Sequence, residues 1–114
     1  MSAAYAIAYV RETVNPSPEI AEYMRRIEGT LEGFGGRFLI HDGVREVLEG
    51  AWPGGLIVIG FPDMDSARRW YASPEYQEIL PLRTRNIVMD VILAEGVPEG
   101  YRAEEAIAKL PFPV

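Results

Sequence analysis

The chain has no cysteine among its 114 residues, which excludes disulfide bridges, a thiolate nucleophile and cysteine-ligated metals. Histidine is nearly as scarce, because His41 is the only one, and one imidazole cannot form a zinc site of the usual composition. No apolar run approaches the roughly 20 residues of a membrane helix. The N-terminus lacks the basic and apolar segments of a secretory signal. We therefore expect a cytoplasmic protein that uses no metal or other cofactor and no membrane.

Positive charge is also in the minority. The formal net charge is −6, from 11 Lys and Arg against 17 Asp and Glu, and Lys109 is the only lysine. Because such a surface repels phosphate backbones, nucleic acid is not an expected partner. The hydrophobic share of 48% is ordinary for a folded domain. A chain of this length can bury roughly two-thirds of its unfolded surface and so form a single core.

The first third of the chain predicts a strand and then a helix. Residues 5–10 alternate with a period of two and are apolar on both faces, which indicates a central strand covered on both sides. Ser17 suits a helix N-cap and Pro18 the first helical position. Apolar residues then recur at spacings of four and three as far as Phe34, and Gly35 supplies the left-handed residue that ends a helix.

A hairpin is predicted next. Residues 37–41 alternate as a strand, with one side formed by Arg37, Leu39 and His41. Asp42-Gly43 is a typical hairpin turn, and residues 44–49 are expected to return as a short strand.

Residues 56–61 predict a strand that is apolar on both faces. Asp63 or Asp65 suits the cap of one helix, and Ser73 suits the cap of the next. Residues 87–93 predict a last strand. The order strand, helix, strand, strand, helix, strand predicts an α+β, ferredoxin-like βαββαβ fold. It has a four-stranded antiparallel sheet and both helices on one face.

The other face of that sheet is expected to carry Ala, Val and Leu rather than charges. A second copy is the simplest cover for such a patch, so we expect a homodimer through the sheet face. Residues 1–97 form this predicted domain. Residues 98–114 form a C-terminal extension with a short helix near 103–110, which we expect to pack on the body or on the partner rather than to close over a pocket.

Three stretches carry a resemblance to a known family: Gly35-Gly36-Arg37-Phe38-Leu39, Val47-Leu48-Glu49-Gly50-Ala51-Trp52, and Ala67 to Gln77 with the following Leu82-Arg83. Together they resemble the family catalogued as domain of unknown function 1330, over about residues 4 to 97. The resemblance implies a dimeric α+β barrel, a superfamily that includes cofactor-free monooxygenases, lactone isomerases, polyketide cyclases, haem enzymes and ligand-binding modules. It implies no particular reaction, because a fold does not fix a function.

Two residues are candidate proton carriers. His41 has the one side chain whose ordinary pKa lies near neutrality, and a carboxylate, either Asp42 beside it or Glu49 across the hairpin, could orient it as a general base. The alternative is a hairpin-end residue that faces solvent. Asp90 interrupts an apolar strand, where a carboxylate needs a partner or a raised pKa. The alternative is an ion pair with Arg11 or Arg85.

A second set of residues is a candidate binding site between sheet and helices: Arg37, Glu49, Trp52, Tyr76 and Arg83, with Tyr9 as a further lining residue. Arginine offers a fork of donors for an anion, and tryptophan offers a flat apolar wall. The alternative is an Arg37–Glu49 ion pair covered by Trp52, with Tyr76 in the core.

Two functions remain open from the sequence. One is a cofactor-free isomerase or cyclase-type enzyme acting on a small anionic or aromatic substrate. In it, Arg37 or Arg83 would hold the anion, and His41 or Asp90 would carry the proton. The other is a non-catalytic dimeric module with a ligand-binding or structural role. A closed cavity in which an arginine meets a titrating group would favour the enzyme.

Overall fold

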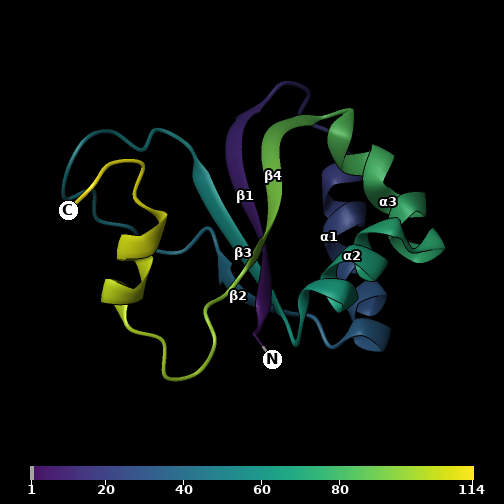
Figure 1. Ribbon diagram of the computed structural model, residues 1–114. Coiled ribbons are helices and arrows are strands. Elements are labelled where there is room, and N and C mark those ends of the chain that lie inside the picture. The colour runs from purple at the N-terminus through teal and green to yellow at the C-terminus, as the bar shows by residue number, and fades with distance from the viewer. Residues whose placement is uncertain (1) are drawn as a thin grey trace.

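The computed structural model describes residues 2–114 and contains one four-stranded antiparallel sheet (Figure 1). Its strands are β1 (Ala4–Thr13), β2 (Arg37–His41), β3 (Gly55–Phe61) and β4 (Ile87–Glu95). The sheet order is β2-β3-β1-β4. The prediction of a central first strand is therefore confirmed.

Three helices, α1 (Pro18–Leu31), α2 (Met64–Ala72) and α3 (Pro74–Thr84), cover the same face of the sheet (Figure 1). Each begins at a predicted cap, whose side-chain oxygen accepts a hydrogen bond from a backbone N–H of the first turn: Ser17, Asp63 and Ser73. A short 3₁₀ helix (Glu32–Phe34) follows α1, and Gly35 ends it with φ 68°. Within the described residues, no helix has both the length and the apolarity that crossing a bilayer requires.

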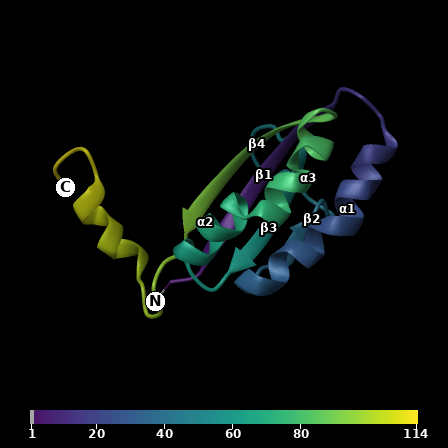
Figure 2. The same ribbon diagram turned by 90° about the vertical axis from the view of Figure 1, so that its right-hand side faces the viewer.

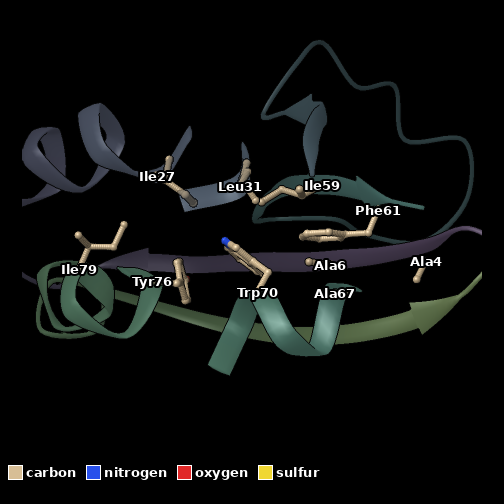
Figure 3. Packing of buried hydrophobic residues seen from close by; sticks show 10 residues of the cluster. All are labelled: Ala4, Ala6, Ile27, Leu31, Ile59, Phe61, Ala67, Trp70, Tyr76 and Ile79. Atoms are coloured by element: carbon tan, nitrogen blue, oxygen red, sulfur yellow. The ribbon is translucent and has the colours of Figure 1, made fainter. Parts of the chain in front are cut away.

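The core lies between the helices and β1, as Figure 3 shows. The ring centroid of Trp70 lies 4.2 Å from that of Tyr76 and 5.3 Å from that of Phe61. The indole Nε1 donates a hydrogen bond of 2.9 Å to Thr30 Oγ1. These large rings fit because the residues of β1 beneath the helices are small: Ala4, Ala6 and Ala8.

The uncovered face of the sheet, called the open face below, differs from the prediction. The alanines of β1 lie under the helices, so the open face of that strand carries Tyr5, Ile7 and Tyr9. The expectation of an uncovered face made of Ala, Val and Leu without charges is therefore wrong in part. The open face is apolar, but its side chains are larger and more aromatic than expected. Arg37 and Asp90 lie on this face as well.

A β-bulge changes the predicted facing of β2. The register with β3 shifts between Phe38 and Ile40, so Leu39 is an extra residue that turns the rest of the strand over. His41 consequently lies on the same face as Phe38, with their rings stacked at a centroid distance of 4.9 Å. The prediction that His41 shares a face with Arg37 is wrong.

The returning strand predicted at residues 44–49 is also wrong, because residues 42–54 form an exposed loop. The turn itself occurs where expected, with Asp42 at φ 51°. The backbone N–H of Asp42, however, donates a hydrogen bond of 2.8 Å to the carbonyl of Leu56. The start of β3 thus occupies the place beside β2 that the returning strand would have taken.

Residues 98–114, called the C-terminal arm below, extend away from the body beyond β4 (Figure 2). They contain the short helix predicted there, a 3₁₀ helix at Ala103–Lys109. The Cα radius of gyration is 16.5 Å, against about 13 Å for a compact chain of this length. The arm contributes to this expansion, because it extends away from its own body (Figure 2).

Candidate functional site

A cavity of about 70 Å³ lies between α1 and the sheet. It exists because α1 packs chiefly on α3 and less closely on the strands. Its wall is mainly aliphatic, with β-strand residues opposite the apolar stripe of α1: Ala6, Ala8, Ile57, Ile59, Met89 and Val91 facing Ile20, Met24 and Ile27. Only four lining side chains carry strong polar groups: Tyr23, His41, Tyr76 and Arg83.

Arg83 is the unusual member of this wall. It is only 6% exposed, and no ion pair with a carboxylate involves it within residues 2–114. Its guanidinium carbon lies 5.9 Å from the ring centroid of Tyr23. Burial acts to lower the pKa of Arg83, but Tyr76 and Tyr23 together outweigh it and the pKa is raised, so the group stays charged. A buried cation without a counter-charge is costly, and an anion would offset that cost.

Two tyrosines flank Arg83. The hydroxyls of Tyr23 on α1 and Tyr76 on α3 share a hydrogen bond of 2.8 Å. Burial, followed by the influence of Tyr76, raises the pKa of Tyr23, so its phenol keeps its proton at neutral pH. One hydroxyl proton makes the shared bond, which leaves the second for another acceptor. The pair therefore offers a neutral donor beside the guanidinium.

His41 lines the same cavity from the end of β2, but it is exposed and so lies at the solvent side. The carboxylate partner considered for it is not there. Asp42 accepts a hydrogen bond of 2.6 Å from Arg45 instead, and Glu49 lies in the exposed loop. The imidazole can exchange protons with water and reach the cavity, without an acid to orient it. Within residues 2–114, no three His, Asp or Glu side chains gather as metal ligands.

Asp90 lies on the open face, on the opposite side of the sheet from the cavity. Arg11 Nε donates a hydrogen bond of 2.7 Å to its carboxylate, and both side chains are more than half exposed. This is the ion pair considered as the alternative in the sequence. A solvated, paired carboxylate at this place cannot reach a ligand bound beneath α1.

The other predicted binding residues also lie on the open-face side or in the loop. The Trp52 ring meets the Tyr9 ring edge-on at 5.3 Å, and Arg37 lies opposite Gly60 at the far end of the sheet. No ion pair joins Arg37 to Glu49 within the described chain. Of the predicted binding residues, only Tyr76 and Arg83 line the cavity. The others lie on the open-face side of the sheet or in the loop.

Tyr23 is the site residue that the sequence reasoning missed. The apolar stripe of α1 includes Ile20, Met24 and Ile27. Tyr23 lies on that same side, three residues after Ile20 and four before Ile27. A tyrosine within an apolar stripe needs a partner for its hydroxyl. That requirement is the signal that could have identified it.

The element order, the sheet order and the helices on one face define a ferredoxin-like α+β protein. Residues 3–97 match the family described as Domain of unknown function (DUF1330), and the chain belongs to that family. Among curated proteins, none matches the chain.

Solved structures share this fold at low sequence identity. A protein of unknown function from Rhodopseudomonas palustris is 16% identical, with a TM-score of 0.65 over 85% of this chain and 84% of that one. SnoaB, a cofactor-independent oxygenase from Streptomyces nogalater, is 14% identical, with a TM-score of 0.57 over 89% and 98%. A dimeric ferredoxin-like protein of unknown function from Thermobifida fusca is 12% identical, with a TM-score of 0.56 over 82% and 91%. Identities this low establish a common fold alone.

Proposed function

We propose that the cavity beneath α1 binds a small organic anion, and that the protein is a cofactor-free enzyme of the isomerase or cyclase type. The observation that carries this proposal is the buried Arg83, a charged group without a carboxylate counter-charge in a mainly aliphatic wall. A carboxylate or enolate oxygen is the planar acceptor that a guanidinium fork fits.

The size of the cavity limits the ligand. An apolar cavity of about 150 Å³ can enclose benzene, and the space here is smaller, about 70 Å³. The enclosed part therefore suits a carboxylate or enolate smaller than benzene. A larger ligand would extend past His41 toward solvent.

The chemistry follows from the four polar groups. His41 takes a proton from the carbon next to a carbonyl, and the C–H electron pair becomes an enolate. Arg83 and the free tyrosine proton stabilise the negative oxygen. Return of the proton from His41 to a different carbon completes an isomerisation without any oxidant or cofactor. The same fold serves SnoaB, which is described as cofactor-independent.

The second candidate is a non-catalytic dimeric module that binds the same kind of anion. The lack of a carboxylate partner for His41 favours it, because a general base is usually held in place by a hydrogen bond. Both candidates require Arg83, and only the enzyme requires His41.

The test for binding compares Arg83→Met with the matched surface variant Arg68→Met. Acetate, acetoacetate and benzoate are titrated against each protein by calorimetry and by thermal shift. We expect at least one anion to bind wild type and Arg68→Met alike, and to bind Arg83→Met at least about tenfold more weakly. Arg83→Met should fold, because an apolar replacement for a buried charge is often neutral or stabilising. Equal affinities for the two variants, or no binding to wild type, would overturn the proposal.

Proton exchange separates the two candidates. In D₂O, the enzyme would exchange the α-protons of acetoacetate faster than buffer does, and His41→Asn would abolish this while it still binds the anion. Binding without exchange by wild type would establish the module instead.

The proposal includes a homodimer that pairs the open faces. A row of apolar residues crosses this face, with Ile7 of β1 opposite both Val58 of β3 and Ile92 of β4. Ile92 is 57% exposed. An apolar sheet face of this kind is typical of an interface, and the Thermobifida fusca protein of the same fold is described as dimeric.

A further inference from the structure

The C-terminal arm is a separate feature of this chain. It begins after residue 97, where the match to the family ends. The hydrogen bonds of its residues are internal: Tyr101 N–H donates to the Pro98 carbonyl at 3.2 Å, and Leu110 N–H donates to the Ile107 carbonyl at 3.1 Å. The arm holds its own shape while it stands off the body.

The direction of the arm is set by its backbone. Pro98 restricts the residue before it to extended conformations. Gly100 has φ 81°, a left-handed conformation that glycine adopts without strain. Together they turn the chain away from the end of β4, as both ribbon views show (Figures 1 and 2). Folding back on its own sheet would require a different backbone at these two residues.

The arm exposes apolar side chains that its own chain does not cover. Ile107 is 50% exposed, Leu110 41% and Phe112 56%. Ile107 lies in the last turn of the 3₁₀ helix, and Leu110 caps that turn, where its backbone N–H donates to the Ile107 carbonyl. The two exposed side chains are therefore close neighbours and form one ridge. Pro113 restricts Phe112 to extended conformations, and Pro111 fixes its own φ just before it, which lowers the entropy cost of docking that ring. An ordered apolar ridge of this kind is suited to a protein surface.

The arm and the loop of residues 42–54 lie on the open-face side of the sheet (Figure 1). They leave the sheet at opposite ends, because the arm follows the end of β4 while the loop joins the end of β2 to the start of β3. The loop also exposes apolar side chains, including Leu48 and Trp52. A second copy seated on the open face would therefore lie between these two projections.

We propose that the C-terminal arm of each subunit packs its ridge of Ile107, Leu110 and Phe112 onto the partner subunit, as a clasp that strengthens the dimer. The occupant is a second copy of this chain, because the surface next to the arm is the open face for which a second copy is already proposed. The clasp rests on that homodimer, and the experiments below separate the failure of one from the failure of the other.

The first experiment uses the absence of cysteine. Leu110→Cys gives a single reactive thiol, which is labelled with a benzophenone maleimide. Labelled chains grown in ¹⁴N are mixed with labelled chains grown in ¹⁵N, and the mixture is then irradiated. We expect crosslinked peptides that join a light chain to a heavy chain. Glu28→Cys, on the exposed surface of α1, is the control and should give none. Crosslinks within one chain only, or no crosslinks in a dimeric sample, would overturn the clasp and leave the dimer standing.

The second experiment measures what the ridge contributes. In the full chain, Ile107→Ser, Leu110→Ser and Phe112→Ser are combined, and the dimer dissociation constant is measured by sedimentation. We expect it to rise at least about tenfold, since three partly buried apolar side chains are lost from the interface. The control, Glu104→Ser with Lys109→Ser, should leave it unchanged. An unchanged constant in the triple variant refutes the clasp, and a monomeric wild type refutes the homodimer and the clasp together.

Discussion

At the scale of single residues, one fully buried amide, Asn86, links the start of α1 to the end of α3. Asn86 Nδ2 donates to Glu19 Oε1 at 3.0 Å and to the Leu82 carbonyl at 2.6 Å. Its Oδ1 accepts a hydrogen bond of 2.8 Å from Asn15. Arg85 binds the same Glu19 carboxylate from outside. This cluster fixes the start of α1 relative to the end of α3.

The Glu19 carboxylate predicts a pH dependence of stability. Hydrogen bonds from Arg85 and then Asn86 hold the pKa of Glu19 below its ordinary value of 4.5. Because the pKa of Glu19 is lowered in the folded state, its carboxylate stabilises the fold fully at pH values above 4.5. That stabilisation is lost as the pH falls through the pKa of the folded state. We expect Glu19→Gln to lose less stability than wild type on acidification from about pH 7 to about pH 3. Urea unfolding midpoints at each pH would measure this. A constant difference between the two proteins across the range would contradict it.

At the scale of elements, the features that local sequence dictates were predictable. The caps at Ser17, Asp63 and Ser73 depend on residues within one turn, and the structure confirms them. The bulge at Leu39 and the unpaired loop were not predictable, because both depend on which distant segment pairs with β2. That one extra residue moved His41 to the cavity side of the sheet.

The junction between the loop and β3 predicts a second outcome. A Cβ on Gly54 would overlap the backbone carbonyl oxygen of Val10 and lie 2.8 Å from the Tyr9 ring. Backbone cannot give way as a side chain can, so Gly54→Ala must displace the loop. We expect it to lower the free energy of unfolding by about 1–3 kcal/mol. Gly43→Ala, where a Cβ meets nothing within 4 Å, is the matched control. Equal urea midpoints for the two variants would count against this close approach.

At the scale of the whole molecule, the sequence predicted the architecture but not the two sides of the sheet. β1 is apolar on both faces, so its pattern could not say which face the helices cover. Packing decides which face the helices cover. The alanines of β1 leave room for Trp70 and Phe61, whereas the tyrosines on its other face would not. Arg83, Tyr76 and His41 consequently share the cavity, whereas Arg37, Trp52 and Asp90 do not reach it.

The open face gives the last prediction, which concerns assembly. If two copies pair these faces, Ile92 becomes buried, and Ile92→Glu would place an unpaired carboxylate in an apolar interface. That costs about 3 kcal/mol or more, roughly a hundredfold in the dimer dissociation constant.

We expect wild type to sediment at twice the chain mass of 12.7 kDa, with a melting temperature that rises with protein concentration. Ile92→Glu should sediment as a folded monomer, because the side chain is already exposed in the single subunit. Ala21→Glu adds the same charge to the exposed surface of α1 and should remain dimeric. A wild type that sediments as a 12.7 kDa particle at micromolar concentration, or an Ile92→Glu variant that still dimerises, would exclude assembly through this face.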